Sequence, residues 1–144
     1  MPTRTANAAW NGNLLEGNGK VQLAGGAFEG QYNFTSRFQE GVGTNPEELL
    51  AAAEAACFSM ALSADLGNAG YAPVSVETVA NVTVEKVDGG FSITTVKLQS
   101  QANVPGITQE QLQEIANGTK KNCPVARALA AIPNWELTVT LVGE

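Results

Sequence analysis

The first third of the chain alternates apolar and polar residues in short runs that glycines separate. Alternation with a period of two residues is typical of a half-buried strand, and glycines between such runs favour tight turns. The pattern predicts strands at residues 5–10, 20–24 and 31–38. We therefore expect this part of the chain to consist of short strands joined by turns.

A long helical pattern follows the third run. Its beginning can be explained in two ways: Asn45 caps the helix and Pro46 takes the first position, or Thr44 caps it and Glu47 completes a capping box. Two glycines after residue 66 can end the helix. The residues that recur at helical spacing are Leu49, Ala53, Ala56, Cys57, Met60 and Ala64. So many alanines indicate close packing against another element.

A hairpin is predicted next. Residues 74–87 and 91–104 alternate like two strands, and the Asp88-Gly89 pair between them is a strong signal for a type I′ turn. The side-chain alternation of the second strand shifts between Ile93 and Val96. Such a shift predicts a β-bulge.

The last third predicts two helices and a strand. Thr108 and Gln111 have the spacing of a helix N-terminus, so a helix is expected over residues 108–120. A shorter helix is expected over residues 124–131 and a final strand over residues 135–142. The order of strands, helix, hairpin, helices and strand is typical of an α+β fold. We interpret residues 1–144 as a single domain.

Charge and composition exclude several kinds of partner. The net charge is −6, which is unsuited to nucleic acid and to anionic membrane surfaces. The most apolar stretch, residues 49–66, is interrupted by Glu54, Ser59, Ser63 and Asp65, so no membrane-spanning helix is predicted. The N-terminal residues lack the pattern of a signal peptide, so we expect a cytoplasmic protein.

The chain contains no histidine and only two cysteines, Cys57 and Cys123. A histidine-dependent triad, a Cys-His dyad and a histidine-ligated metal site are therefore excluded within the chain, and two thiolates are too few for a zinc site of four. If a cysteine is the nucleophile, a group other than imidazole must activate it.

The two cysteines lie in different surroundings. Cys57 is on the apolar stripe of the long helix, where a free cysteine is often only a small buried hydrophobe. Cys123 follows Lys120 and Lys121 and precedes a predicted helix N-terminus, and both features stabilise a thiolate. On this reasoning Cys123 is the more acidic thiol, although it can equally be an unreactive loop residue. Their separation along the chain permits a disulfide but does not establish one.

Arg37 and Glu47 are the remaining candidates. Arg37 ends a strand-like run and, by itself, would be read as a surface charge; it matters because few other groups can activate a thiol. Glu47 has an adequate structural explanation, because a carboxylate in the first turn of a helix offsets the helix dipole.

Two segments resemble the signature of the OsmC/Ohr family, and specifically its OsmC branch. The first is GTNPEELLAAAEAACFSMALS at residues 43–63, and the second comprises VPGI at residues 104–107 and NCPVARAL at residues 122–129. The flanking strands and the hairpin also fit the family pattern. The resemblance therefore covers nearly the whole chain.

The resemblance implies an intertwined homodimer of α+β fold with strands around central helices. It implies that Cys57 attacks an organic hydroperoxide and that Cys123 resolves the product as a disulfide, which an external dithiol then reduces. It further implies an ion pair between Arg37 and Glu47 beside the reactive thiolate. No metal, haem or flavin is expected.

One position departs from the pattern. Relatives in the OsmC branch commonly carry histidine three residues before the first cysteine, and this chain has Glu54 there. Side chains at this spacing on a helix can be neighbours. A carboxylate near Cys57 would oppose formation of the thiolate.

The distance along the long helix constrains the role of Glu47. Ten positions separate Glu47 from Cys57, which corresponds to roughly 15 Å of helix. Glu47 would therefore act through Arg37, across a break in the helix, or from the partner chain; we favour a site at the dimer interface.

Two other functions are compatible with the same residues. One is a redox sensor or ligand-binding dimer whose cysteines oxidise slowly, and the other is a structural dimer with inert thiols. Turnover with a dithiol separates the sensor from a peroxidase, and alkylation rates expose inert thiols.

Overall fold

The structure is a computed structural model that describes residues 1–143. The chain forms two compact units, one comprising residues 1–49 and the other beginning at Leu50.

The first unit contains a three-stranded antiparallel sheet in the order β1-β2-β3. Its strands are β1 (Ala6–Asn11), β2 (Asn18–Leu23) and β3 (Glu29–Tyr32). Pairing of Ala8 with Val21 and of Val21 with Gly30 sets the register across the sheet. The first two predicted strands are thus confirmed.

The third predicted strand was wrong in its second half. β3 ends at Tyr32, and the chain continues as a short helix, α1 (Phe34–Phe38). The reason is a capping box: the Asn33 side chain accepts from the Ser36 backbone N–H, and the Ser36 hydroxyl accepts from the Asn33 backbone N–H. These two hydrogen bonds satisfy the backbone N–H groups of Asn33 and Ser36. In a continued strand, those groups would have needed partners on a neighbouring strand.

The long helix is α2 (Pro46–Asn68), and it runs without a break. Asn45 is its N-cap, because the Asn45 side chain accepts from the Glu48 N–H at 2.7 Å and its carbonyl accepts from the Leu49 N–H. The alternative capping by Thr44 is not formed; its hydroxyl donates instead to the Glu48 carboxylate at 2.8 Å.

The second unit is built on a sheet in the order β4-β5-β6. β4 (Ser75–Val87) and β5 (Gly90–Asn103) are antiparallel, and β6 (Asn134–Leu141) pairs with β5 in parallel. The register shifts at Thr83 and Val84, where Thr94 of β5 has no opposite partner. The predicted bulge is therefore confirmed.

The predicted hairpin is also confirmed, but its turn type was wrong. Val87 pairs with Gly90, so the loop has two residues, Asp88 and Gly89. Gly89 has a positive φ of 93°, whereas no described residue other than glycine has a positive φ. A type I′ turn requires positive φ at both loop residues, and Asp88 does not adopt it.

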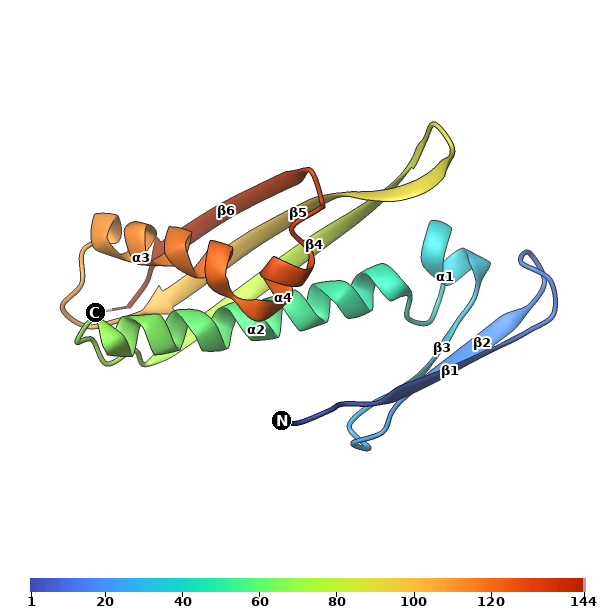
Figure 1. Ribbon diagram of the computed structural model, residues 1–144, viewed down its shortest axis with the longest axis horizontal. Coiled ribbons are helices and arrows are strands. Elements are labelled where there is room, and N and C mark those ends of the chain that lie inside the picture. Colours follow the sequence, from blue (N-terminus) through green and yellow to red (C-terminus); the bar gives the residue numbers. More distant parts are fainter. Residues whose placement is uncertain (144) are drawn as a thin grey trace. The chain divides into compact units, whose positions relative to one another are not determined.

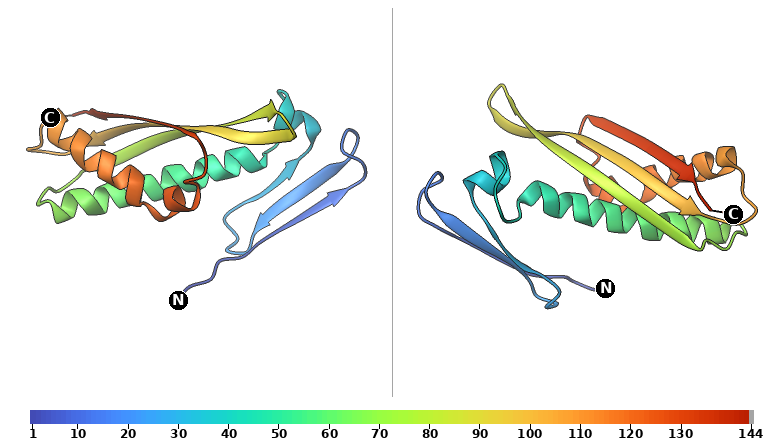
Figure 2. Two further views of the ribbon diagram at one scale, coloured as in Figure 1. Left: turned by 45° about the horizontal axis from the view of Figure 1, so that its top comes forward. Right: turned by 180° about the vertical axis from the view of Figure 1, so that it is seen from behind.

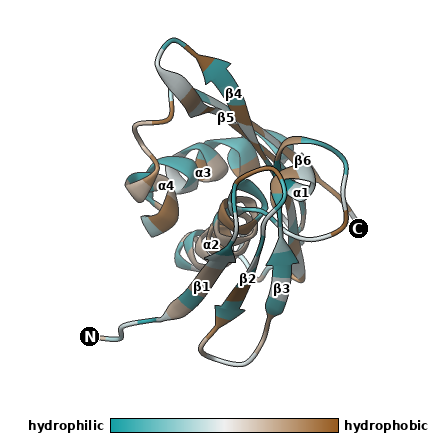
Figure 3. Cartoon of the chain, turned by 90° about the vertical axis from the view of Figure 1, so that its right-hand side faces the viewer, coloured by the Kyte–Doolittle hydropathy of each residue, from teal (hydrophilic) through white to brown (hydrophobic). Residues whose placement is uncertain are grey.

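Two helices connect β5 to β6, as a parallel pairing requires. α3 (Gln109–Asn122) is capped by Thr108 in the predicted capping box with Gln111. α4 (Pro124–Ala128) is shorter than predicted, since Leu129 already leaves helical geometry at its C-cap. The views in Figures 1, 2 and 3 show α2, α3 and α4 on the same side of the sheet.

Helices and sheet enclose one hydrophobic core. α2 contributes Phe58, Leu62 and Leu66, each fully buried, and these pack with buried residues of the sheet and of α3. The partners from the sheet and α3 include Val96, Leu98, Ala102, Leu112, Ala116 and Val139. The mixed α and β architecture expected from the sequence is confirmed.

By length and composition, α2 is apolar enough to cross a membrane, and it is the one such helix in residues 1–143. The sequence pattern had predicted no such helix. One face of α2 nevertheless carries Phe58 and Leu62 into the core, and Asp65 on that helix accepts a hydrogen bond from Thr119. These contacts are those of a core helix that packs on its own sheet.

Candidate active site

The two cysteines of the second unit meet. The Sγ atoms of Cys57 and Cys123 are 3.0 Å apart, and both residues are free thiols. Cys57 lies in the middle of α2, and Cys123 is the junction between α3 and α4. Residues far apart in the sequence are thus positioned for direct reaction of one sulfur with the other.

Pro124 explains why the chain turns at Cys123. A residue before proline is disfavoured in helical geometry, and Cys123 accordingly adopts φ −57° and ψ 131°. The turn ends α3 and starts α4 with proline at its first position. As a result, the thiol is held at a fixed corner rather than on a regular helix face.

Cys123 is buried, with 1% of its surface exposed, while Cys57 is partly exposed. Burial is the largest cause that raises the pKa of the Cys123 thiol, and the hydrogen bond to Cys57 and the negative charges of Glu54 and Cys57 act in the same direction, so that the pKa reaches about 12. A hydrogen bond with the Ala126 backbone lowers it, by less. Cys123 therefore holds its proton at neutral pH.

The prediction that Cys123 would be an acidic thiol was wrong. It relied on the lysines before Cys123 and on the helix N-terminus after it. The α4 amide does act in the expected direction, but the loss of solvent around a buried sulfur has the larger effect.

Glu54 is the third member of this cluster. Its side chain is fully buried, and its Oε1 lies 3.5 Å from the Sγ of Cys123, which donates to it. Its Oε2 is buried and has no hydrogen-bond partner among residues 1–143. Burial raises the pKa of the Glu54 carboxyl, although the hydrogen bond from Cys123 lowers it. The spacing along the helix had predicted only that Glu54 and Cys57 are neighbours. Nothing in the sequence indicated that Glu54 contacts Cys123.

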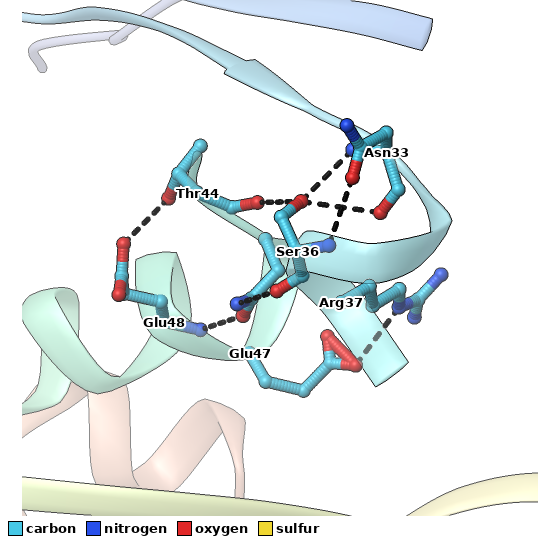
Figure 4. A network of polar contacts seen from close by, with 7 residues as sticks. Asn33, Ser36, Arg37, Thr44, Glu47 and Glu48 are labelled. Atoms are coloured by element: carbon cyan, nitrogen blue, oxygen red, sulfur yellow. Dashed lines mark hydrogen bonds and ion pairs between the residues drawn. The ribbon is translucent and has the colours of Figure 1, made fainter. Parts of the chain in front are cut away.

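The first unit holds the second pair of candidate residues. Arg37 Nε donates to Glu47 Oε1 at 2.9 Å, and the Glu47 side chain is nearly buried while Arg37 is partly exposed. The expected ion pair is present, but it is not bidentate: Glu47 Oε2 has no partner in the described residues. In Figure 4 the contact between the two side chains runs through Arg37 Nε.

A polar network fixes the elements that carry this pair. The Ser36 hydroxyl donates to the Thr44 carbonyl at 2.8 Å, and the Asn45 side chain donates to the Ser36 carbonyl at 2.8 Å (Figure 4). These bonds tie α1 to the residues just before α2. Arg37 on α1 and Glu47 on α2 are thereby held within reach of each other.

An aromatic cleft of about 250 Å³ lies beside Arg37 within the first unit. Arg37 is one wall, and its guanidinium carbon stands 5.1 Å from the centre of the Phe38 ring. The other lining residues are mainly apolar: Trp10, Leu14, Tyr32, Asn33, Phe34 and Phe38. No pattern in the sequence predicts this cleft, because its walls come from β1, the loop after it, β3 and the unpredicted α1.

The site residues therefore form two groups. Cys57, Cys123 and Glu54 are together in the second unit, and Arg37 and Glu47 are together in the first. Among residues 1–143, no three histidine, cysteine or acidic side chains are grouped so that they could hold a metal ion.

Comparison with known proteins gives consistent matches. The sequence profile of a family described as OsmC-like protein matches residues 39–138. The peroxiredoxin OsmC of Escherichia coli is 46% identical over 129 residues, which are 89% of this chain and 90% of that protein. An organic hydroperoxide resistance protein of Xanthomonas axonopodis is 33% identical over 70% of this chain and 68% of its own length.

Solved structures agree with the sequence matches. An organic hydroperoxide resistance protein from Elizabethkingia anophelis superposes with a TM-score of 0.76 and 27% identity, covering 98% of this chain and 99% of its own. The organic hydroperoxide resistance protein OhrB of Bacillus subtilis gives a TM-score of 0.70, also at 27% identity, and covers 96% of this chain and 98% of its own.

Proposed function

This chain belongs to the OsmC-like family, and from that premise we propose that it is a cysteine-based peroxidase that reduces organic hydroperoxides. The observation that carries the proposal is the 3.0 Å separation of the Cys57 and Cys123 sulfurs. A thiol so close to a second thiol can trap an oxidised sulfur before it reacts further. We treat residues 1–144 as one functional domain, because the family match crosses the boundary between the two units.

The proposed cycle has three steps. The Cys57 thiolate attacks the terminal peroxide oxygen, the O–O bond breaks, and the alkoxide leaves as an alcohol after taking up a proton. Cys57 is now a sulfenic acid. Cys123 attacks the Cys57 sulfur, a disulfide forms, and water leaves. An external dithiol reduces the disulfide by thiol–disulfide exchange and becomes a disulfide itself.

The assignment of roles follows from exposure. In the single chain Cys57 is partly exposed and Cys123 is buried, so Cys57 is the more accessible of the two sulfurs. The high pKa of Cys123, about 12, suits a thiol that stays protonated while peroxide arrives. These features support Cys57 as the attacking residue and Cys123 as the resolving residue.

Arg37 is proposed to favour the Cys57 thiolate and to hold the peroxide oxygens. Its permanent charge and planar set of donors suit both tasks. The hydrogen bond to Glu47 uses Nε, and neither Nη atom donates to Glu47 in the described residues (Figure 4). Glu47 would thus orient the guanidinium without occupying the donors that the substrate needs.

The aromatic cleft supports an organic substrate. Phe34 and Phe38 pack with ring centres 5.2 Å apart, and Trp10 and Tyr32 with centres 5.4 Å apart. Such walls bind apolar groups, while the adjacent Arg37 offers donors to a polar end. A molecule with a hydrocarbon body and a hydroperoxide head matches this combination.

A homodimer is proposed because α2 is apolar on more than its core face. Ala52, Ala53, Ala56 and Ala64 are exposed, and Met60 is 77% exposed. A helix that is apolar around its circumference is normally buried on all sides. A second copy of this chain would cover that face, and we propose that the active site is completed at this dimer interface.

The cytoplasm is the proposed compartment. A cysteine pair that must return to the dithiol state in each cycle needs a reducing environment.

Steady-state turnover tests the proposed function. With tert-butyl hydroperoxide and excess dithiothreitol, the wild-type protein should consume peroxide continuously, and Cys57→Ser should consume none. Cys123→Ser should form the sulfenic acid but no disulfide between these positions. A Cys57→Ser variant with wild-type turnover would contradict the proposal, and oxidation once without turnover would favour a redox sensor.

A further inference from the structure

Glu54 has no role in the cycle described so far, yet its position is unusual. It is an acidic side chain with no exposed surface, one carboxylate oxygen contacts the Cys123 sulfur, and the other has no partner among residues 1–143. Burying a carboxyl with an unsatisfied oxygen destabilises a protein. A cost of this kind at a reactive centre indicates a function.

The resolving step needs a group that removes a proton. The nucleophile in disulfide formation is a thiolate. Burial raises the pKa of Cys123 to about 12 in the reduced protein, so its thiol stays protonated at pH 7. Since Cys123 is 1% exposed, bulk water has little access to its proton.

We propose that Glu54 is the general base of the resolving step, taking the proton from Cys123 as Cys123 attacks the Cys57 sulfenic acid. This inference rests on the proposed peroxidase function. It concerns a position where the family resemblance offers no guide, because the chain carries a different residue there.

The step balances in atoms and charge. The Cys123 S–H proton moves to the Glu54 carboxylate, and the Cys123 sulfur forms a bond with the Cys57 sulfur. The S–O bond of the sulfenic acid breaks with its electron pair. The departing hydroxide takes the proton from Glu54 and leaves as water. The two sulfurs end as a disulfide, in which each is formally one electron more oxidised than in a thiol. Glu54 is again a carboxylate.

Geometry supports this role over proton loss to solvent. Glu54 Oε1 is 3.5 Å from the Cys123 Sγ and already accepts its proton as a hydrogen bond. The same Sγ can donate to Cys57 at 3.0 Å, so oxidation of Cys57 leaves Glu54 as the basic acceptor. The titratable groups that interact with Cys123 are Glu54 and Cys57, both from α2.

Burial also adjusts the strength of the base. The raised pKa of Glu54 makes its carboxylate more basic than an exposed one, and general catalysis improves as the pKa of the base approaches the operating pH. Gln at this position would keep the size and one acceptor oxygen but could not take a proton.

Single-turnover kinetics of Glu54→Gln test the inference. Reduced protein is mixed with one equivalent of cumene hydroperoxide, and samples are quenched over time. Dimedone labelling reports the Cys57 sulfenic acid, and mass spectrometry reports the disulfide. We expect sulfenic acid in both proteins, but disulfide formation at least roughly a hundredfold slower in Glu54→Gln at pH 7.

The pH profile distinguishes a base from a structural role. The rate of disulfide formation in wild type should level off once Glu54 is ionised. In Glu54→Gln it should keep rising about tenfold per pH unit toward the pKa of Cys123, because only thiolate already present can react. Glu54→His, which restores a base, should recover much of the rate, and Glu114→Gln on the exposed face of α3 should behave as wild type.

The outcomes separate the inference from the proposed function. Equal disulfide rates and equal pH profiles in wild type and Glu54→Gln would overturn the role of Glu54 while the peroxidase cycle stands. Absence of Cys57 sulfenic acid in both proteins would overturn the cycle and the inference together. If Glu54→Gln does not fold, as judged by circular dichroism, the pH profile of Glu54→His decides: a level region that follows imidazole ionisation supports the base, and an unchanged profile contradicts it.

Discussion

Glu54 should carry a pH-dependent cost in stability. Its raised pKa means that the folded chain binds this proton more tightly than the unfolded chain does. The resulting stabilisation is fully present below the unfolded pKa of about 4.5 and is lost as pH rises through the folded pKa. A buried carboxylate therefore weakens the fold near neutral pH.

Glu54→Gln should remove that cost. We expect the variant to gain stability relative to wild type as pH rises from 4 to 8, because amide burial does not change with pH. Urea unfolding of both proteins at several pH values measures the difference. A difference that stays constant across this range would show that Glu54 ionisation does not affect stability.

Arg37 should matter more than Glu47 for the peroxidase reaction. Arg37→Ala removes the charge and the donors proposed to act on the thiolate and the peroxide, and the loss of one such donor typically costs about a hundredfold or more in rate. Glu47→Ala leaves the guanidinium in place but unheld, so a smaller loss is expected.

The rate of Cys57 oxidation by tert-butyl hydroperoxide measures both effects. Arg37→Lys is the matched control, because it keeps the charge and loses the planar fork. A fully active Arg37→Ala variant would show that Arg37 neither stabilises the thiolate nor binds the peroxide.

Sequence reasoning at this scale named the candidate residues but not all their properties. Cys57, Cys123, Arg37 and Glu47 could be named from the family motifs, and the structure pairs them as two couples. The acidity of Cys123 could not be predicted, because local charge is visible in a sequence and burial by distant elements is not. The contact with Glu54 spans 69 positions, and no local pattern indicates it.

The short helix α1 is the element that presents Arg37. Asn33→Ala removes the capping side chain that accepts from Ser36, so we expect about 1 kcal/mol lower stability and reduced peroxidase activity. Urea unfolding and the rate of Cys57 oxidation measure the two effects.

Thr108→Ala provides the control at the other capping box. It removes the equivalent cap of α3 and should cost a similar free energy of unfolding. Because α3 does not present Arg37, its activity should remain near that of wild type in the same assay. Equal activity losses in both variants would show that α1 has no special role.

Elements with strong local signals were predicted well. The hairpin followed from Asp88-Gly89, the bulge from a shift in alternation, and α3 from Thr108 and Gln111. α1 was missed because the residues after Tyr32 alternate like a strand, and its capping box uses serine rather than the usual glutamate or glutamine. Turn type also escaped prediction, since it depends on backbone angles that two residues do not determine.

At the scale of the whole molecule, the proposed active site depends on a homodimer. Met60→Glu places a charge on the exposed apolar face of α2, so we expect dissociation into monomers and loss of turnover. Analytical ultracentrifugation gives the oligomeric state. Met60→Leu keeps the apolar surface and should remain a dimer with normal turnover.

Hybrid dimers show whether Arg37 acts on Cys57 of its own chain or of the partner chain. A dimer of one Arg37→Ala chain and one Cys57→Ser chain has one intact set of groups only if Arg37 acts across the interface. Activity that neither parent dimer shows would support a shared site. Persistent inactivity of purified hybrids would place Arg37 and Cys57 of one chain in the same site.

The oligomeric state could not be predicted from the pattern of apolar residues alone. The alanine-rich helix indicated close packing against some element, but the pattern in one chain does not specify what covers the exposed face of α2. The expectation of a second copy came from the family resemblance. The exposed Met60 and alanines of the folded chain now supply a physical reason for it.

Mass spectrometry of the fully reduced protein after one equivalent of an organic hydroperoxide shows what becomes of both sulfurs in a single experiment. If Cys57 is the peroxidatic residue and Cys123 the resolving one, we expect one alcohol released per chain, loss of two hydrogen atoms, and a single cross-linked peptide pair that joins Cys57 to Cys123. Protein in which Cys57 stays reduced, or is oxidised to a sulfinic acid without any link to Cys123, would contradict these roles.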